Sequence, residues 1–583
     1  MTPSFTTEKQ DAQPTVKQDG QADYLIIGGG TAGAVLAARL SESGRHRVVL
    51  VEAGIDTPPG SVPADIQDTF PSSTLNPEYF WPGLEATIVK GGKPRPFPQA
   101  KVMGGGSSIM GMFALRGVPS DFSRWAAAGA DGWSWDEAVK FYRKIEDDPA
   151  RPGRARGSSP IRRMSEAEWP PFVAAMKDAA GSLGLPYIAD INEVPGDGFF
   201  PMPVSRDSNT RSTSAGCYLT STVRSRKNLT ILANTRATRL MFSGRKAVAV
   251  EVERDGVLEN LSARRVIVSA GAIHSPAILL RSGVGPASEL ERMGIKPILD
   301  LPGVGRNLQN HSYLFYALTL PRGKRLAQEL RRFVIAGMRA SSMLPDCPES
   351  DLLLFTLGRV SPRSFGTTVA MVGSALYSPF SKGSVTLVSS DLSANPRIDF
   401  RMLDDPRDAP RVVKGARLLE TLLSDPGVKD CYNEAFLLPA AMAVNQFNRR
   451  GVAGAAMAVG AQVALNAPGP LRRMAVRRTL NVRQSLAERR GESQITDEEI
   501  LASITPMGHP VGTCAMGAPR DSQTVVDSGY RVSGLENVYV VDASVMPVIP
   551  SANTNLPTLM VAEHAADKLL ATASGKIVGQ ALI

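Results

Sequence analysis

The chain has 583 residues, of which 43% are hydrophobic and 21% charged, and its formal net charge is +9. These proportions are ordinary for a globular protein, and the length predicts several domain-sized units. No stretch reaches the ~18–20 continuous apolar residues of a membrane-spanning helix, which excludes that class of protein. Residues 1–22 are polar and lack an apolar segment, so we expect a disordered leader rather than a secretion signal.

Cysteine usage points to a reducing compartment. The four cysteines, Cys217, Cys347, Cys431 and Cys514, are far apart and form no C-x-x-C pair. We therefore expect neither a metal site nor a disulfide, and a cytoplasmic protein fits this pattern.

The first predicted elements form a dinucleotide-binding unit. An apolar strand precedes Gly28, Gly30 and Gly33, which stand in G-x-G-x-x-G spacing at the start of an Ala/Leu-rich helix. In such a unit the glycines allow a tight turn, a close approach to a pyrophosphate, and close packing of the helix on the strand. A second apolar strand, 48–51, ends at Glu52, whose carboxylate can accept ribose hydroxyls. The alternative is a glycine turn in an α/β domain that binds no ligand.

A second glycine-rich loop follows at residues 101–108. Its backbone N–H groups could wrap the diphosphate or ring of a cofactor, although alone it could be any flexible turn. Residues 117–135 are interpreted as a loop that leads into a helix over 136–145, for which Ser134 is a suitable N-cap.

The middle of the chain mixes strands and helices. Residues 228–232 and 247–250 are predicted to form a β-meander. Residues 265–271 are predicted as a strand that ends in small residues, where the backbone can pass close to a ligand. A helix is expected over 272–282. Residues 312–500 alternate strands with Arg- and Ala-rich helices and contain no catalytic pattern.

Positive charge is concentrated between residues 449 and 490, which contain nine arginines and one acidic residue, Glu488. The same segment holds an Ala/Met/Val-rich run over 452–467. One interpretation is an amphipathic insertion that lies on an anionic membrane surface or covers the substrate entrance. The other is a solvated basic helix face beside a core helix. Nucleic-acid binding is not expected, because the arginines lack interleaved aromatic residues for base stacking.

Near the C-terminus, His509 and Asn553 stand 44 residues apart, with an apolar, strand-like segment between them. An imidazole beside a hydrogen-bonding amide can take a proton from an alcohol, because its ordinary pKa of about 6.5 lies near neutrality. The pair is therefore a candidate catalytic site.

The other four histidines are expected to have structural roles. His274 is assigned to helix packing and His311 to a structural loop, while His46 and His564 occur in helix or turn contexts. The alternative base is His564, on a helix predicted over 557–570.

Four stretches make the chain resemble the glucose–methanol–choline (GMC) oxidoreductases. They occur in the family's order between about Asp23 and Leu570, at residues 101–125, 271–285, 301–308 and 509–544. Within that family, residues 52–57 and 552–558 are most similar to the 5-(hydroxymethyl)furfural oxidases.

The resemblance implies an α/β fold. In it, a Rossmann-type FAD-binding domain is interleaved with a substrate domain built on an antiparallel sheet with helices. The expected parts of the FAD-binding domain are 23–150, 226–312 and 501–583, the last with the catalytic pair. Those of the substrate domain are 151–225 and 313–500.

The same resemblance implies that FAD binds through the N-terminal unit, with its flavin ring under His509 and Asn553. His509 would take the hydroxyl proton of the alcohol while a hydride passes to flavin N5, and Asn553 would hold the substrate oxygen. Ala237 corresponds to the adenine contact. The positions that match cofactor contacts of the family are Gly28, Gly30, Thr31, Ala32, Glu52, Ala53, Met103, Gly105, Ser107, Ala237, Ala270, Asp542, Ala543, Thr554 and Asn555.

Three positions depart from the family pattern. Ile109 stands where some members attach FAD to a histidine, so non-covalent FAD is expected. Met110 replaces an asparagine near the flavin, and Gly508 replaces an aromatic residue before the catalytic histidine. Both are expected at the substrate pocket. The missing side chain at Gly508 predicts a roomier pocket that accepts bulky or secondary alcohols.

The expected activity is oxidation of a small alcohol to a carbonyl compound, with electrons passed to O₂. One alternative is a dehydrogenase that delivers electrons to a quinone or another carrier, at a membrane through residues 449–490. Another is a flavoprotein of the same fold with non-oxidative or light-driven chemistry. The intact His509 and Asn553 favour an active oxidoreductase.

Overall fold

The computed structural model describes residues 21–151, 156–331, 333–440, 451–480 and 495–573, together with 448, 482, 485 and 486. Most of the predicted leader lies outside the described residues. Ala22, which was assigned to the leader, already begins the first strand, because its backbone pairs with Ala263.

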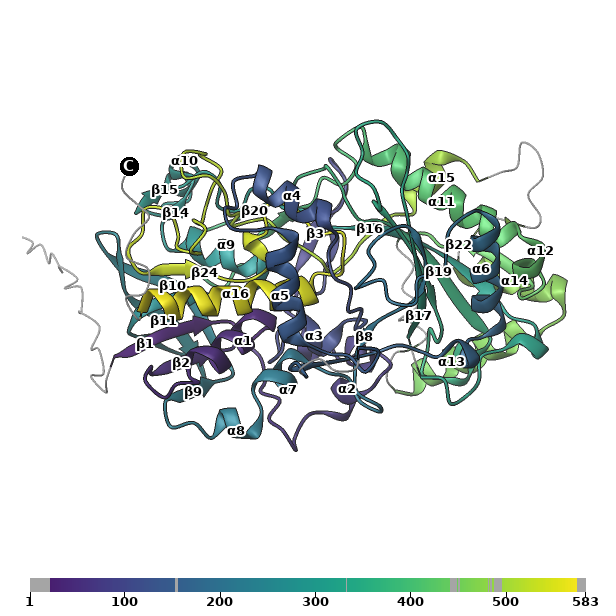
Figure 1. The fold of residues 1–583 in the computed structure, drawn as a ribbon, viewed down its shortest axis with the longest axis horizontal. Coiled ribbons are helices and arrows are strands. Elements are labelled where there is room, and N and C mark those ends of the chain that lie inside the picture. The colour runs from purple at the N-terminus through teal and green to yellow at the C-terminus, as the bar shows by residue number, and fades with distance from the viewer. Residues whose placement is uncertain are drawn as a thin grey trace, which may run out of the picture.

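A five-stranded parallel sheet holds segments from both ends of the chain side by side, in the order β24-β13-β1-β2-β9. Such sheets are covered on both faces, which explains why their strands are almost continuously apolar. Figure 1 shows the C-terminal helix (yellow) lying against the N-terminal strand and helix (purple). The strands are β1 (Ala22–Ile27), β2 (Val48–Val51), β9 (Leu229–Leu232), β13 (Ala263–Val268) and β24 (Val538–Val540), and the helices are α1 (Thr31–Leu40) and α16 (Asn555–Ala573).

The predicted β-meander is wrong in its first strand. β9 pairs with β2 at the edge of the parallel sheet. The meander consists of β10 (Thr235–Ser243), β11 (Lys246–Arg254) and β12 (Val257–Leu261). A four-residue apolar run is compatible with a parallel sheet and with an antiparallel meander, so tertiary packing decides which of the two it joins.

A larger antiparallel sheet occupies the other side of the molecule (Figure 1). Six strands follow the order β22-β16-β19-β18-β17-β7, and the short β23 pairs with β16. These strands are β7 (Gly198–Pro201), β16 (Ser312–Thr319), β17 (Val334–Ala340), β18 (Leu352–Leu357), β19 (Val369–Leu376), β22 (Glu434–Leu437) and β23 (Thr505–Pro506). Helix α11 (Asp408–Ser424) packs against β18 and β19. The predicted fold class, a parallel dinucleotide-binding sheet joined to an antiparallel sheet, is confirmed.

Two local predictions are also confirmed. Helix α5 (Trp135–Ile145) begins after Ser134, whose hydroxyl accepts a hydrogen bond from the backbone N–H of Glu137 at 3.1 Å. Helix α9 (Gly271–Arg281) matches its expected range within one residue. No helix among the described residues combines the length and apolar character needed to cross a bilayer.

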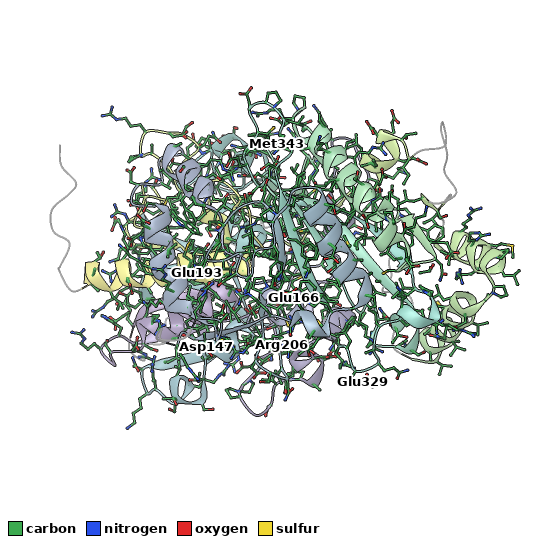
Figure 2. All side chains as sticks on the ribbon, turned by 45° about the vertical axis from the view of Figure 1, so that its right-hand side comes forward. Asp147, Glu166, Glu193, Arg206, Glu329 and Met343 are labelled. Carbon is green, nitrogen blue, oxygen red and sulfur yellow. The ribbon has the colours of Figure 1, made fainter. Side chains whose placement is uncertain are left out.

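A buried ion-pair network joins residues 116 and 146 to the segment 151–193. The side chain of Arg116 is 2% exposed and pairs with Glu146 and Glu193. Arg151 bonds Glu146 as well and reaches Asp190 at 2.9 Å. Glu193 is labelled in Figure 2. Buried charges require such partners, because an unpaired charge in the interior is strongly destabilising.

Candidate active site

A cavity of about 380 Å³ opens where the carboxyl ends of β1, β2 and β13 meet, and it extends to the antiparallel sheet. Open α/β sheets bind ligands at this edge. The expected site residues that line it are Gly28, Gly30, Thr31, Ala32, Glu52, Ala53, Gly105, Ser107, Met110, Ala237, Ala270, Gly508, His509, Asp542, Ala543, Asn553, Thr554 and Asn555. Met103 does not line the cavity. It is buried under the glycine turn, and a Cβ built on Gly29 would lie 2.5 Å from its Sδ.

The glycine turn is close-packed as its spacing predicts. Gly28 has φ +103°, and a Cβ there would lie 2.5 Å from the carbonyl oxygen of Ser269 in the segment after β13. A Cβ on Gly33 would lie 1.8 Å from the carbonyl oxygen of Gly28. Only glycine therefore allows α1 to start this close to the two strands.

Glu52 is held rigidly at the end of β2. Its Oε2 accepts the backbone N–H of Gly29 at 2.7 Å and its Oε1 that of Gly54 at 2.8 Å. Burial raises the pKa of this carboxyl, while the two backbone hydrogen bonds oppose the shift. Ala53 contributes a further backbone hydrogen bond, and a carboxylate has about four acceptor positions, so Glu52 can still accept a ribose hydroxyl.

Two long helices begin at the cavity. Thr31, the first residue of α1, donates its hydroxyl to Oδ1 of Asn555, the first residue of α16, at 2.8 Å. The N-terminus of a helix offers unpaired N–H groups and a partial positive charge. Both helix starts therefore suit the anionic and carbonyl oxygens of a dinucleotide.

Asp542 orders the start of a third helix. Its Oδ2 accepts the backbone N–H of Gly271 at 2.8 Å and the hydroxyl of Ser275 at 2.5 Å, and its Oδ1 accepts the N–H of Ser544 at 2.7 Å. Burial raises the pKa of this carboxyl. Asp542 thus lines the cavity while its oxygens hold α9 and the segment after β24 together.

His509 lies at the centre of a half-buried polar cluster at the wall of the cavity. Its Nε2 is 3.1 Å from Nδ2 of Asn553, and the hydroxyl of Tyr377 donates to Oδ1 of the same amide at 2.9 Å. On the other side, its Nδ1 is 3.0 Å from Nδ1 of His311. Its backbone N–H donates to Oδ1 of Asn310 at 3.2 Å. The pair proposed from sequence is therefore brought together, with three further side chains around it.

The hydrogen bonds assign the protons of this cluster. Because Tyr377 donates to the amide oxygen of Asn553, the amide nitrogen faces His509 and donates to Nε2. The proton of the neutral imidazole then sits on Nδ1 and is donated to Nδ1 of His311. This tautomer leaves the Nε2 lone pair of His509 on the side of Asn553.

Burial keeps both imidazoles neutral. It lowers the pKa of His509 to about 3. The pKa of His311 is held well below its ordinary value by burial and, next, by the neighbouring His509, although backbone groups of Tyr377 and Pro550 oppose the shift. His311 also stacks on the Tyr377 ring, with centroids 4.3 Å apart and planes 4° apart. The ring of His311 is therefore fixed in position.

From the sequence, His311 follows a structural loop and has no predicted part in the site, whereas the structure places its Nδ1 3.0 Å from Nδ1 of His509. A signal was available: His311, Tyr313 and Phe315 alternate along the chain and so share one face of an extended segment. By contrast, His564 lies in α16 against Trp133 and bonds Tyr530, away from the cavity.

The part of the cavity beside this cluster is walled by aromatic and apolar side chains. The Tyr313 and Phe315 rings are 4.8 Å apart edge to face, and Phe315 meets Phe355 at 5.6 Å. Gly373 makes room for two of them, because its Cβ would lie 2.5 Å from the Phe355 ring. The wall consists of Met110, Met112, Phe113, Tyr313, Phe315, Phe333, Phe355 and Leu357.

The absence of a side chain at Gly508 does not by itself leave an empty space beside His509. A Cβ built on Gly508 would lie 2.9 Å from Cε and 3.4 Å from Sδ of Met110. The thioether of Met110 thus lies where a side chain at position 508 would begin. The two departures from the family pattern are therefore in contact, and a side chain at position 508 would require Met110 to move.

The chain belongs to the GMC oxidoreductases, FAD-dependent enzymes that act on CH–OH groups. Family models described as GMC oxidoreductase match residues 22–313 and 379–562. The predicted family is thereby confirmed.

Relatives match over nearly the whole length. A 5-(hydroxymethyl)furfural oxidase of Methylovorus sp. (strain MP688) is 35% identical over an alignment of 570 residues, and the match covers 94% of this chain and 99% of that protein. An oxygen-dependent choline dehydrogenase of Vibrio vulnificus (strain YJ016) is 29% identical, with 94% of each chain covered. The crystal structure of pyridoxine 4-oxidase from Mesorbium loti has a TM-score of 0.76 at 28% identity, covering 94% of this chain and 99% of that one.

Proposed function

We propose that this protein oxidises a neutral, apolar alcohol to a carbonyl compound, with His509 as the base and FAD as the hydride acceptor. The observation that carries the proposal is the His509–Asn553 pair, 3.1 Å apart at the wall of the cavity. An alcohol oxygen that reaches both atoms can accept the amide N–H of Asn553 and donate its proton to Nε2 of His509. Two atoms this close can both lie within hydrogen-bond reach of one alcohol oxygen, which is the arrangement that general base catalysis requires.

The residues present fit FAD. Glu52 offers a free acceptor position at the end of β2, and two helix N-termini and a glycine turn face the same cavity. When bound, FAD accepts the hydride of the alcohol. Ile109 is fully buried in a small cluster with Ile66 and Tyr79 and offers no atom for a covalent link. This favours non-covalent FAD.

The protein's own contribution is to hold the hydroxyl group and remove its proton. Asn553 is fixed by Tyr377, so its amide nitrogen can stabilise negative charge that develops on the alcohol oxygen. His509 gives its Nδ1 proton to the hydrogen bond with His311, so Nε2 carries no proton and can take that of an alcohol that displaces the amide hydrogen bond of Asn553. The imidazolium that forms then shares its Nδ1–H with a neutral acceptor.

The wall beside His509 favours a neutral substrate. None of its eight residues carries a charge, whereas an ion buried there would need a partner. The Tyr313 hydroxyl adds one hydrogen-bonding group, and burial raises the pKa of that phenol to about 12, so it stays neutral. Aromatic alcohols match this wall by ring packing.

For the electron acceptor we favour O₂, because two of the most similar proteins bear the name oxidase. The alternative is a dehydrogenase that uses a quinone or another carrier.

Anaerobic addition of benzyl alcohol should bleach the flavin absorbance within one turnover, and admission of air should restore it with one H₂O₂ per aldehyde. Bleaching that a quinone reverses but air does not would establish the dehydrogenase. An absence of bleaching with any of a series of benzylic, aliphatic and furanic alcohols would refute the proposed function.

Met110 is expected to set the preference between primary and secondary alcohols. Met110→Ala removes the thioether beside Gly508 and should raise kcat/KM for 1-phenylethanol relative to benzyl alcohol by about 10-fold, within the range for a few methylene groups in a pocket. Gly508→Ala should lower that ratio, because its Cβ would press on Met110. Met402→Ala, in a buried cluster elsewhere, serves as the matched control. Unchanged ratios in both pocket variants would show that this space does not meet the substrate.

A further inference from the structure

Helices α13 (Val452–Asn466) and α14 (Gly469–Leu480) form a hairpin at the end of the molecule opposite the parallel sheet (Figure 1). Helix α13 contains no charged residue. The hairpin leaves five large apolar side chains 54–87% exposed. They are here called the outer face and are Val452, Val459, Val463, Leu471 and Met474.

This exposure contradicts the interpretation of residues 452–467 as a core helix. Within α13 only Gly454 and Ala458 are buried. The exposed side of this fifteen-residue apolar helix is covered by no other part of the chain that the structure describes.

The hairpin is nevertheless firmly anchored. The guanidinium of Arg472 donates two hydrogen bonds of 2.9 Å to the carboxylate of Glu434 in β22. Arg325 donates to Oδ1 of Asn466 at 2.6 Å, and Ala458 packs on Phe365. These contacts fix which side of the hairpin faces the protein, so the outer face is a defined surface.

We propose that the outer face docks on an anionic lipid surface. Its side chains are aliphatic and lack the Trp and Tyr residues that dominate protein interfaces. In sequence, residues 449–490 contain nine arginines and one glutamate, so the segment carries a formal charge of +8. Aliphatic side chains that enter the acyl boundary, in a segment of strongly positive net charge that attracts acidic headgroups, are typical of interfacial helices.

A second copy of the chain fits this surface less well than lipid. A two-fold interface places the same patch on both subunits, so two strongly basic segments would face each other. Their mutual repulsion would oppose the association, whereas an anionic surface neutralises the same charges.

Docking would place the substrate wall near the lipid. Leu465 of α13 and Val476 of α14 belong to the same apolar cluster as Phe333, Phe355 and Leu357, which line the cavity. An apolar alcohol dissolved in the lipid would then be concentrated on the side of the molecule that holds this wall. The docking itself does not depend on the reaction proposed above.

The test uses the FAD-loaded protein and sedimentation with vesicles. We expect binding to vesicles that contain phosphatidylglycerol, weaker binding to pure phosphatidylcholine, and release at high salt. Val459→Asp combined with Val463→Asp should lower the partition coefficient on anionic vesicles about 10-fold or more. The matched control, Val257→Asp combined with Leu258→Asp, changes two valine- and leucine-sized side chains of similar exposure on β12 and should bind like the unaltered protein.

Three outcomes would overturn the proposal. The first is no binding of the unaltered protein to anionic vesicles, and the second is equal binding by the protein and its α13 double variant. The third is self-association in sedimentation velocity that the α13 variant abolishes, which would make the outer face an interface between copies. Alcohol turnover without vesicles should be unchanged in both double variants, which shows that they are folded.

Discussion

Replacement of His509 by alanine is expected to lower kcat/KM for alcohols by about 10²–10⁴-fold, the usual contribution of a positioned general base. The variant should still bind FAD, because His509 touches Asn553, His311 and Asn310 rather than the glycine turn. The measurement is single-turnover flavin reduction, with the FAD content of each preparation determined from its absorbance.

The matched control is His564→Gln. His564 is also a buried histidine whose pKa burial lowers, to about 4, but it lies against Trp133 and Tyr530 outside the cavity. Its replacement should leave flavin reduction nearly unchanged. Near-normal reduction in His509→Ala, or an equal loss in both variants, would remove His509 from the mechanism.

The pH profile adds a second readout for His509. Because burial lowers its pKa to about 3, the imidazole is already unprotonated at pH 5, and kcat/KM should not fall near pH 6.5 as it would for an exposed histidine. The thermal stability of the protein must be measured over the same pH range. Below pH 6.5 the unfolded chain takes up protons at histidines that stay neutral when folded, so the free energy of unfolding decreases as the pH falls toward 3. If kcat/KM falls at low pH in parallel with Tm, the loss of activity reports unfolding of the protein rather than protonation of His509.

The sequence predicted those parts of the site whose functional residues lie within a few positions of each other in the chain. These parts are the glycine turn, the end of β2 with Glu52, and the two segments that contain His509 and Asn553. Spacing alone therefore indicated a dinucleotide site. The family resemblance then indicated that the two ends of the chain meet, and the pairing of β24 with β13 beside β1 brings them together.

The aromatic wall and the partners of His509 could not be predicted in the same way. Tyr313, Phe355 and Tyr377 come from or follow strands of the antiparallel sheet, where alternating apolar residues look the same whether they face a core or a ligand. The contact between Gly508 and Met110 spans 398 positions of the chain, and only the fold reveals it. For α13, an apolar run suits burial as well as a lipid surface, and exposure decides between them.

Replacement of His311 by leucine is expected to lower kcat by about 10- to 100-fold with little change in KM. His311 acts as a positioning residue: its Nδ1 accepts the Nδ1–H of His509 and thereby keeps Nε2 unprotonated and turned toward Asn553. Leucine offers no acceptor, so the positive charge that develops on His509 in the transition state loses a hydrogen bond worth about 1–3 kcal/mol, and the barrier rises by a similar amount.

His311→Gln separates this role from simple packing. Its amide oxygen can accept the same N–H, so it should recover most of the lost kcat, although neither variant keeps the imidazole that stacks on Tyr377. A merely structural role predicts that both variants lose Tm and activity together. If glutamine fails to recover kcat while Tm and FAD content match those of the leucine variant, the hydrogen bond between the two imidazoles does not hold the base in its reactive tautomer.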